Sequence, residues 1–370
     1  MKAVVLVGGE GTRLRPLTCN IPKPMVPIAN RPFLESMIEQ LKSHGIDDII
    51  LCMGYMPDKI RSYFGDGRDF GVKMTYVVEN SPLGTAGAVK NVEELLDGTC
   101  FVFNADIITD LDLTSMLRFH RENCAKVTIA LTPVDDPTSY GIVETEAVGR
   151  VRRFLEKPGW DEVTTNMINA GTYIIEPEVL KLVPQGVFYM FERGLFPALL
   201  QGGESVFGYP SSSYWIDIGT PQRYLAVHHD LLLGKLASKF PGVRHSDGVW
   251  AGEGVRIDPT AKVAGPVIFG RGCIVGGNAH ITGPTVVGDN CEIGDGATVE
   301  ESVVWRDTKI GPHATVKGSM LGEGVCVAEG VCLIGGVVIG DGARIGAGNS
   351  LEHGARIWPG KVIEEGTVTF

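Results

Sequence analysis

The chain has 370 residues, of which 44% are apolar and 21% are charged, and its formal net charge is −11. This composition is typical of a folded globular protein with about two domains. The negative charge argues against nucleic acid or an anionic membrane surface as a partner. An anionic substrate must therefore be bound by a local cluster of basic side chains.

The sequence contains neither an apolar run long enough to span a membrane nor a recognisable signal peptide. Its 8 cysteines form no C-x-x-C pair. We therefore expect no membrane span, free thiols rather than disulfides or a zinc site, and a cytoplasmic location.

The most distinctive stretch is VVLVGGEGTRLRP near the N-terminus. Its apolar, β-branched residues Val4–Val7 predict a buried strand. The glycines that follow allow the backbone to turn sharply and to approach a ligand closely (Gly8, Gly9 and Gly11). Together with Arg13 and Arg15, such a loop is suited to holding phosphate groups.

Two standard phosphate-binding motifs do not fit this stretch. The dinucleotide fingerprint requires a third glycine, but Gly11 is followed by Thr12, Arg13 and Leu14. A P-loop requires Gly-Lys-Ser/Thr, which is absent here. The glycines alone also agree with a simple structural turn. The motifs in the rest of the chain must therefore show whether this loop binds phosphate.

Strands and helices alternate over the first hundred residues. The expected helices are Phe33–His44, Met56–Phe64 and Ala86–Leu96, and the expected strands are Ile49–Met53, Lys73–Val78 and Cys100–Asn104. This alternation predicts an α/β fold with a mostly parallel, doubly wound sheet. Ligands bind at the carboxyl ends of the strands in such sheets, where the glycine loop and Asp106 are expected.

The later part of this domain contains further strands and helices. We expect strands at Val127–Thr132, Ile142–Thr145, Arg152–Glu156, Asn169–Ile175 and Ser205–Tyr209, and helices at Thr114–Glu122, Leu195–Leu200 and Pro221–Leu236. Charged residues with Pro241 and Gly242 then indicate a linker. The predicted domains are therefore 1–236 and 251–370, joined by a linker at 237–250.

An apolar residue recurs at every sixth position through the C-terminal domain. These anchors are Ile257, Val263, Phe269, Val275, Ile281, Val287, Ile293, Val299, Trp305, Ile310, Val316, Leu321, Val327, Leu333, Ile339, Ile345, Leu351 and Ile357, with five-residue steps at Ile310 and Leu321. A hexapeptide repeat predicts a parallel β-helix, here with about six coils. Its anchors would stack as buried columns, and its glycines would fit the corners.

Several motifs in order resemble the sugar-1-phosphate nucleotidylyltransferases. They are GGEGTRLRPLT, IPKP, PLGTAG, EKP, INAGTYI and WIDIGTP, and with the hexapeptide tail the resemblance covers essentially the whole chain. One departure is the metal motif, which in the family more often reads NSD than NAD. The resemblance implies a Rossmann-like nucleotidyltransferase domain followed by a left-handed β-helix.

The resemblance also implies the reaction NTP + sugar 1-phosphate → NDP-sugar + pyrophosphate. The chain is most similar to two-domain mannose-1-phosphate guanylyltransferases, which implies GTP and mannose 1-phosphate as substrates. The nucleophile is already ionised, so the reaction needs charge stabilisation by basic residues and metal ions rather than a general base.

The resemblance assigns the catalytic roles. Arg13 would contact the leaving phosphates, and Lys23 would hold the triphosphate or the sugar phosphate, with prolines on both sides restricting its backbone. Asp106 and Asp217 would bind Mg²⁺, because hard carboxylates suit this ion. The structural alternatives are a surface ion pair for Arg13, a solvated loop lysine for Lys23, and helix-cap roles for the two aspartates.

The resemblance also assigns the substrate-binding residues. The nucleotide-binding set is Leu6, Gly8, Gly9, Gly11, Thr12, Arg13, Glu79, Gly84 and Thr85, and the sugar-phosphate set is Gly141, Glu156, Lys157, Asn169 and Gly171. Relatives that use thymine or uracil often have glutamine at the position of Glu79. A carboxylate accepts both adjacent donors of guanine, so Glu79 favours GTP, although a solvated glutamate is the alternative.

Three other functions remain open at this stage. The first is a nucleotidylyltransferase that uses glucose 1-phosphate with dTTP or UTP. The second is a bifunctional enzyme whose β-helix is also an acyltransferase, with His280, His313 or His353 as base. The third is a non-catalytic sensor of nucleotide sugars, which should lack one of the four catalytic residues. The regular faces of a β-helix also predict a homo-oligomer.

Overall fold

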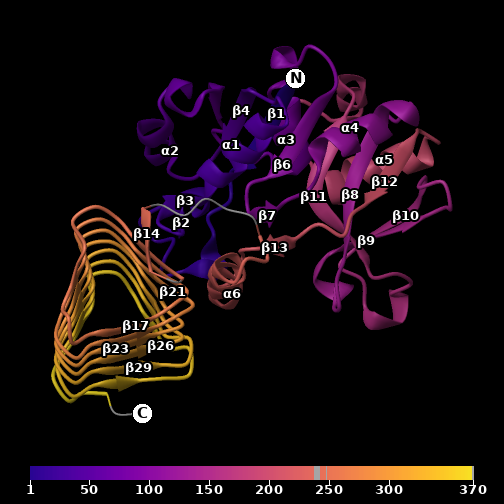
Figure 1. The fold of residues 1–370 in the computed structure, drawn as a ribbon. Coiled ribbons are helices and arrows are strands. Elements are labelled where there is room, and N and C mark those ends of the chain that lie inside the picture. Colours follow the sequence, from indigo (N-terminus) through magenta and orange to yellow (C-terminus); the bar gives the residue numbers. More distant parts are fainter. Residues whose placement is uncertain (237–241, 247, 369–370) are drawn as a thin grey trace. The chain divides into compact units, whose positions relative to one another are not determined.

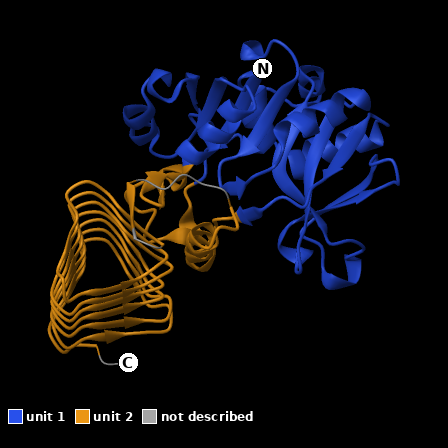
Figure 2. Cartoon of the chain, viewed as in Figure 1, with its two compact units in different colours: residues 1–9, 34–216 blue, residues 10–33, 217–370 orange. Residues whose placement is uncertain are grey.

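The computed structural model describes residues 1–236, 242–246 and 248–368. Its contacts divide the chain into two compact units (Figure 2). Unit 1 comprises 1–9 and 34–216, and unit 2 comprises 10–33 and 217–370. The segment 10–33, which carries Arg13 and Lys23, therefore belongs to the same unit as the hexapeptide repeats.

Unit 1 is built on a twisted mixed sheet (Figure 1). Its path is β10 (Val151–Glu156), β9 (Gly141–Thr145), β11 (Met167–Ile175), β6 (Cys100–Asn104), β1 (Lys2–Val7), β4 (Asp48–Met53) and β5 (Lys73–Val78), and β8 (Val127–Pro133) joins β11 to β12 (Val206–Pro210). Strands β6, β1, β4 and β5 are parallel, as predicted. Beyond β6 the sheet becomes mixed, because β11 runs antiparallel to β6, β8 and β9.

The helices pack around this sheet and bury its apolar faces (Figure 1). They are α1 (Phe33–Ser43), α2 (Pro57–Phe64), α3 (Gly84–Lys90), α4 (Leu113–Glu122) and α5 (Phe196–Gln201). The core joins strand residues such as Val4 and Val102 with helix residues such as Ala86 and Val89, all fully buried. Burial of this apolar surface is the main stabilising contribution to the unit.

Two predicted helices end earlier than expected. The predicted helix Ala86–Leu96 is α3, which ends at Lys90 and is followed by the 3₁₀ helix η4 (Glu93–Leu95). The predicted helix Pro221–Leu236 is α6 of unit 2, which ends at Leu232. Gly234 follows with a left-handed φ of 79°, a conformation that commonly terminates helices.

The hexapeptide region of unit 2 is a parallel β-helix, whose coils stack in the lower part of Figure 1. One of its sheets contains β14 (Val243–Ser246), β15 (Val249–Ala251), β18 (Val267–Phe269), β21 (Thr285–Val287), β24 (Val303–Val304), β27 (Met320–Leu321), β30 (Val338–Ile339) and β33 (Arg356–Ile357). We call strands β15 to β33 of this sheet the docking sheet.

Two further sheets complete each coil. The first contains β16 (Arg256–Ile257), β19 (Ile274–Val275), β22 (Glu292–Ile293), β25 (Lys309–Ile310), β28 (Cys326–Val327), β31 (Arg344–Ile345) and β34 (Val362–Ile363). The second contains β17 (Lys262–Ala264), β20 (His280–Thr282), β23 (Thr298–Glu300), β26 (Thr315–Lys317), β29 (Cys332–Ile334) and β32 (Ser350–Leu351). Apart from Trp305, the predicted anchors lie inside the coils, with Ile257, Val263 and Ile357 partly buried at the two ends.

One anchor was predicted wrongly. The strand register pairs Val287 with Val304 and Val304 with Leu321, so Val304 occupies the interior column. Trp305 therefore lies outside the column, and the first five-residue step falls at Val304 rather than at Ile310. Both neighbours are apolar, so only the stacking of adjacent coils distinguishes them.

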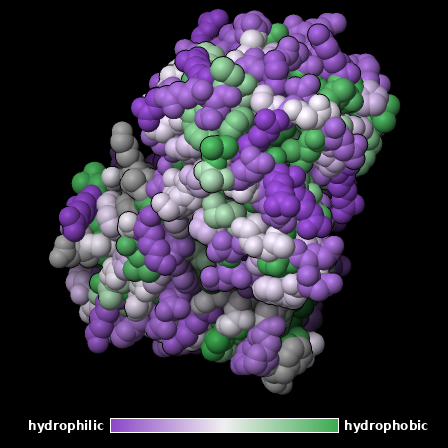
Figure 3. Space-filling view, turned by 90° about the vertical axis from the view of Figure 1, so that its right-hand side faces the viewer, coloured by the Kyte–Doolittle hydropathy of each residue, from purple (hydrophilic) through white to green (hydrophobic). Residues whose placement is uncertain are grey.

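The remaining predictions concern the linker, the surface and the thiols. The predicted linker 237–250 falls partly on residues outside those described, and its described part contains β14 and the start of β15. Among the described residues, no helix is long and apolar enough to cross a membrane. Apolar side chains are scattered among polar ones over the face in Figure 3. All eight cysteines lie in the described part of the chain and are free thiols.

Candidate active site

The glycine loop begins at the carboxyl end of β1 in unit 1. Gly8 and Gly9 are exposed there. A Cβ added to Gly8 would lie 3.9 Å from the backbone nitrogen of Gly54 and 4.0 Å from Oε1 of Glu79. These residues follow three neighbouring parallel strands, β1, β4 and β5, so their ends form one open edge where a ligand can approach the backbone.

Glu79 follows β5 and is half-buried. Its Oε2 accepts a hydrogen bond from the backbone N–H of Leu83 at 3.1 Å. Burial of the carboxylate raises its pKa, and the hydrogen bond from Leu83 lowers it by a smaller amount. The backbone thus orients the carboxylate and occupies one of its oxygens, while Oε1 lies on the side of Gly8.

Gly84 is required by the packing of the loop that follows Glu79. It has a left-handed φ of 72°, and an added Cβ would lie 2.7 Å from the carbonyl oxygen of Tyr189. That carbonyl accepts hydrogen bonds from the backbone of Ala86 and Gly87 at 3.0 and 2.9 Å. A side chain at position 84 would displace this whole contact.

Asp106 lies in the turn between β6 and β7 (Ile107–Thr109) and is half-buried. The backbone N–H of Ala105 donates to the carbonyl of Leu6 at 3.1 Å. This bond continues the pairing of β1 with β6 to the carboxyl edge of the sheet. Leu6 therefore positions the strand end that precedes Asp106.

Three predicted sugar-phosphate residues lie together on the β9–β10 hairpin. A Cβ added to Gly141 would lie 2.8 Å from Oε2 of Glu156, so the glycine allows this carboxylate to lie against the backbone. Lys157 is exposed and has a left-handed φ of 52°. A strained backbone at a non-glycine residue is a common feature of ligand-binding sites. The N–H of Lys157 donates to the carbonyl of Tyr140 at 2.9 Å, which holds this conformation.

Asn169 and Gly171 belong to a buried polar network in unit 1. Asn169 donates from Nδ2 to the hydroxyl of Tyr173 at 2.9 Å and accepts the N–H of Gly171 at 3.0 Å. The Tyr173 hydroxyl donates to Oε1 of Glu192 at 3.4 Å. Glu192 is buried, which raises its pKa, and the nearby charge of Glu156 raises it further.

Thr85 connects this network to the loop after Glu79. Its hydroxyl donates to Oε2 of Glu192 at 3.1 Å and accepts the backbone N–H of Phe191 at 2.9 Å. Its side chain is therefore held by protein groups. No local motif marks the segment around Glu192, because its partners Thr85 and Tyr173 are distant along the chain.

The segment of unit 2 that follows the glycine loop carries the other predicted residues. Gly11 has a left-handed φ of 63° and precedes the 3₁₀ helix η1 (Thr12–Leu14). Thr18 donates from its hydroxyl to the carbonyl of Gly11 at 2.8 Å. The side chains of Thr12 and Arg13 are exposed on this turn.

Three basic side chains surround Asp217 in unit 2. Lys23, which is nine-tenths buried, brings Nζ to 3.5 Å from Oδ1 of Asp217. Oδ2 lies 3.1 Å from Nη1 of Arg223 and 3.8 Å from Nη2 of Arg13. A Cβ added to Gly219 would collide with both Arg13 and Asp217, so this glycine leaves room for the pair. We call Lys23, Arg13 and Arg223 the cationic cluster.

Arg223 was missed in the sequence analysis. It lies in the first turn of α6 (Pro221–Leu232), which Thr220 caps by accepting the N–H of Arg223 at 3.3 Å. The signal was present, because a helix that starts just after Asp217 brings the side chain of Arg223 back toward it. Three cations against one carboxylate leave an excess of two positive charges, which suits a polyphosphate ligand.

Asp217 has the properties of a metal ligand. Its Oδ1 is buried and accepts no hydrogen bond from the described residues. A buried carboxylate oxygen that accepts no hydrogen bond is a suitable ligand for a divalent cation such as Mg²⁺. The described residues contain no group of three or more His, Cys, Asp or Glu side chains arranged to hold a metal. A bound ion would therefore take most of its ligands from substrate phosphates and water, with at most two protein carboxylates.

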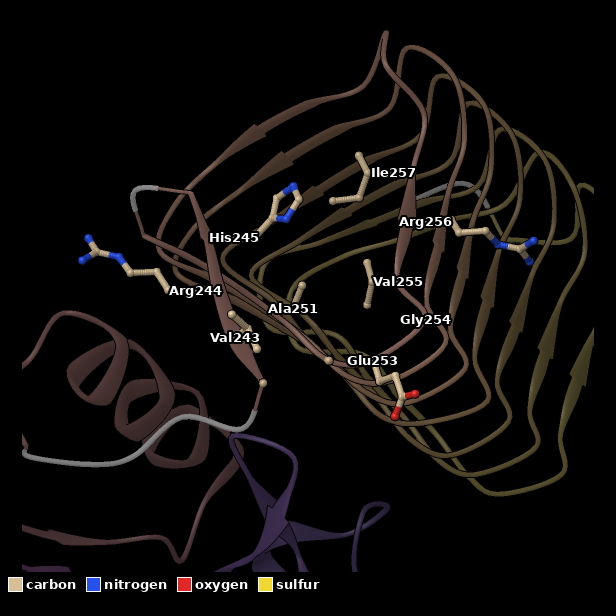
Figure 4. Close-up of a pocket in the computed structure, with 11 residues that line it drawn as sticks. Val243, Arg244, His245, Ala251, Glu253, Gly254, Val255, Arg256 and Ile257 are labelled. Atoms are coloured by element: carbon tan, nitrogen blue, oxygen red, sulfur yellow. The ribbon is translucent and has the colours of Figure 1, made fainter.

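A hollow at the first coil of the β-helix contains none of the predicted site residues (Figure 4). Ala251, Val255 and Ile257 lie at its centre, with His245 beside them. Val255 and Ile257 pack against the interior of the β-helix. The hollow is thus the open end of the coil stack rather than a substrate site.

Comparison with known proteins identifies the family. A family model described as Nucleotidyl transferase matches residues 2–233. The chain belongs to the nucleotidyl transferase family. Members of this family generally use divalent metal ions. A second model, the EIF2B subunit epsilon LbH domain, matches residues 246–367, and the hexapeptide coils are accordingly a left-handed β-helix.

The curated relatives of this nucleotidyl transferase have names that differ in both the sugar and the nucleotide. A Mannose-1-phosphate guanylyltransferase of Mycobacterium tuberculosis is 42% identical over 272 residues, which are 73% of this chain and 75% of the relative. A Mannose-1-phosphate guanyltransferase of Candida albicans is 40% identical over 328 residues, 87% and 86% of the two chains. A UTP–glucose-1-phosphate uridylyltransferase of Synechocystis is 35% identical over 343 residues, 88% of each chain.

Solved structures resemble the nucleotidyl transferase part. HddC from Yersinia pseudotuberculosis, crystallised in complex with GMP-PN, is 31% identical with a TM-score of 0.53. The match covers 61% of this chain and 96% of HddC. This agreement supports the Rossmann-like fold of the nucleotidyltransferase domain.

Proposed function

We propose that this nucleotidyl transferase converts GTP and mannose 1-phosphate to GDP-mannose and pyrophosphate. The observation that carries the proposal is the cationic cluster around Asp217, whose excess positive charge suits the phosphates of two anionic substrates. The names of the relatives of M. tuberculosis and C. albicans support the choice of base and sugar.

In the proposed reaction, an oxygen of the sugar phosphate attacks the α-phosphorus of the nucleotide. The bond between the α-phosphorus and the bridging oxygen breaks, and pyrophosphate leaves with that electron pair. Arg13 and Lys23 stabilise the charge that develops on the phosphates. The buried position of Lys23 strengthens this effect, because less water screens its charge.

We propose Mg²⁺ as the divalent ion of this enzyme, with Asp217 and Asp106 as protein ligands. The buried Oδ1 of Asp217, which lies 3.5 Å from Nζ of Lys23 and accepts no hydrogen bond from the described residues, supports the first assignment. Asp106 is supported by its position at the carboxyl edge of the sheet in unit 1. When bound, Mg²⁺ would neutralise phosphate charge and make pyrophosphate a better leaving group.

For base recognition, we propose that Glu79 accepts the two adjacent donors of guanine. Its orientation by Leu83 and its position beside Gly8 support this role. Backbone groups at Leu6, Gly8, Gly9, Gly11, Thr12 and Gly84 complete the proposed nucleotide site. Thr85 is expected to hold the loop in place and not to bind the nucleotide through its hydroxyl, because that hydroxyl already bonds Glu192 and Phe191.

For the sugar phosphate, we propose contacts from Lys157 to the phosphate and from Glu156 to the hydroxyl groups. Gly141, Asn169 and Gly171 shape the same region of unit 1. Glu192 is an addition to this set. It joins the network of Asn169 and Tyr173, and the charge of nearby Glu156 raises the pKa of Glu192.

The test is pyrophosphate release with Mg²⁺, measured for GTP, dTTP, UTP and ATP against mannose and glucose 1-phosphates. We expect a clear preference for GTP with mannose 1-phosphate. A preference for UTP or dTTP with glucose 1-phosphate, as in the name of the Synechocystis relative, would retain the mechanism but reject the base assignment. Absence of turnover in every combination would favour a protein that only binds nucleotide sugars.

The metal assignment has its own test. We expect Asp106→Ala to lower turnover by about 100-fold or more, because charge on the phosphates would be less well compensated. Asp135→Ala, at an exposed position on the same unit, is the control. Unchanged turnover of the Asp106 variant would reject this ligand.

We also propose a homo-oligomer formed through the β-helix and a cytoplasmic location. The first coil supports the assembly, because β16 and β17 are edge strands of their sheets among the described residues. The free thiols support a reducing compartment. The exposed positions of His280, His313 and His353 do not favour an additional acyltransferase activity.

A further inference from the structure

The outer face of the docking sheet is buried, unlike the outer faces of the other two sheets. The residues just before each interior anchor point outward, and those on the five middle strands of the docking sheet are nearly inaccessible: Ile268, Val286, Val303, Met320 and Val338 are at most 2% exposed. None of them belongs to the interior cluster of the β-helix. On the neighbouring sheet the equivalent residues include Glu292, Lys309 and Arg344, which are exposed.

Elements of unit 2 lie against this face. Helix α6 contacts β21. The indole N–H of Trp305 donates to the hydroxyl of Tyr224 on α6 at 3.0 Å, and that hydroxyl donates to the carbonyl of Pro27 at 2.6 Å. Tyr224 is fully buried, so this chain of hydrogen bonds is shielded from water.

The segment 10–33 runs along the same face from one end to the other. Asn30 donates to the carbonyl of Val287 at 2.8 Å in an early coil. Asn20 donates to Asp341 at 2.9 Å in a later coil. Nη1 of Arg356, on the last strand of the docking sheet, donates to the carbonyls of Arg13 and Arg15 at 3.3 and 2.9 Å. The segment is therefore attached at both ends and near its middle.

Arg356 interrupts an otherwise apolar column. It occupies the outward position of β33, where the five preceding strands carry the buried apolar residues described above. The change of residue type coincides with the turn that carries Arg13. A guanidinium here binds two carbonyl oxygens and holds them on the side of the β-helix. The guanidinium of Arg356 thereby offsets the partial negative charges of these two carbonyls.

We propose that the β-helix is a positioning platform for the phosphate-binding turn and that Arg356 is its positioning residue. Arg356 acts through the backbone of Arg13 and Arg15, not by touching substrate. This inference rests on the proposed function, since it assigns Arg356 an effect on the same reaction. It also makes a structural claim about the turn that can be measured without turnover.

The test compares Arg356→Gln and Arg356→Lys with Arg344→Gln. Arg344 is an exposed arginine on the outer face of β31, one coil earlier on another sheet, and provides the matched control. Hydrogen exchange of the backbone amides of Leu14, Arg15, Leu17 and Cys19, which are bonded within the turn, reports on the turn directly. Thermal unfolding reports on overall stability, and pyrophosphate release gives kcat and the two KM values.

We expect Arg356→Gln to speed exchange in the turn about threefold or more, with an unchanged thermal midpoint. The value of kcat should fall about 10-fold, because Arg13 is displaced from the transition-state phosphates, while KM for mannose 1-phosphate stays within about twofold. Arg356→Lys should recover part of kcat, and Arg344→Gln should match the unmodified enzyme.

Exchange and kinetics like those of the unmodified enzyme would overturn the inference. So would an equal loss in Arg344→Gln, or a loss of activity in proportion to a lower thermal midpoint, because either result means a general effect on folding. If the unmodified enzyme turns over no substrate pair, the proposed function fails, while the exchange data still decide whether Arg356 holds the turn.

Discussion

Glu79 has one oxygen held by the backbone of Leu83, and burial raises its pKa. Glutamine at this position keeps the size but replaces one acceptor oxygen by a donor. We expect Glu79→Gln to lower kcat/KM for GTP about 10-fold to 100-fold and to raise the relative use of UTP or dTTP. The measurement is pyrophosphate release with each nucleotide at limiting concentration.

Glu204→Gln, at an exposed position of unit 1, is the control for this substitution. Because the pKa of Glu79 is raised, the preference for GTP should also weaken on acidification before an ordinary glutamate would protonate. An unchanged ratio of GTP to UTP use in the Glu79 variant would mean that other groups read the base.

His228 is a buried residue of α6 whose titration affects stability. Its Nδ1 donates to the carbonyl of Tyr224 at 2.8 Å, and Nε2 has no partner among the described residues. Burial lowers its pKa from 6.5 to about 4. Below pH 6.5, His228 is protonated in the unfolded chain but stays neutral in the folded chain. The free energy of unfolding therefore falls as the pH decreases toward 4.

We expect this residue to account for about 3 kcal/mol of stability loss between pH 6.5 and 4. His228→Gln removes the titration and should reduce the difference in unfolding free energy between these two pH values. His280→Gln, at an exposed histidine of the β-helix, should leave it unchanged. If the unfolding free energy of the His228 variant and of the unmodified protein changed equally between these pH values, His228 would not be the group responsible.

At the scale of elements, Trp305 joins the β-helix to α6. It follows the anchor Val304 at a corner where the equivalent residues of neighbouring coils are Gly288 and Gly322. A tryptophan is not required there by the coil itself, and its 5% exposure results from contact with elements outside the coil. The corner residue therefore serves the attachment of α6.

We expect Trp305→Ala to lower the free energy of unfolding of unit 2 by about 3–5 kcal/mol, because it leaves a cavity and removes the hydrogen bond that the buried Tyr224 hydroxyl accepts. Trp358 follows the anchor Ile357 at the corresponding corner and is 47% exposed. Trp358→Ala should cost less than about 1 kcal/mol. Equal shifts of the denaturation midpoint in the two variants would show that Trp305 is not an attachment point.

At the scale of the whole molecule, the open end of the β-helix predicts assembly. Strands β16 and β17 leave one edge unpaired among the described residues, and unpaired edges favour association. We expect sedimentation to give a mass that is a multiple of 39.7 kDa. Val263→Pro, in the middle of the edge strand β17, would hinder pairing with a further strand and should shift the protein toward monomers.

Sedimentation at several protein concentrations distinguishes specific assembly from aggregation. A monomer at all concentrations would reject the proposed oligomer. A multimer that is unaffected by the Val263 variant would place the interface elsewhere on the molecule.

The sequence by itself determined the two architectures and supplied most of the candidate residues of the proposed site. The β-helix is readable because each coil repeats the same local requirement, an inward apolar residue such as Val275 or Ile293 at fixed spacing. The glycines and prolines around Arg13 and Lys23 are readable because they restrict or free the backbone locally. Both the repeat and these backbone restrictions can be recognised without knowing which distant segments of the chain are in contact.

Only the tertiary structure decided the relations between distant segments. The bonds of Glu192 with Thr85, of Arg223 with Asp217, and of Arg356 with the carbonyl of Arg15 have no local period. The choice of Val304 over Trp305 likewise depended on stacking between coils. Side chains that act through long-range packing leave no repeating pattern along the chain, so the fold has to bring them together before their roles can be recognised.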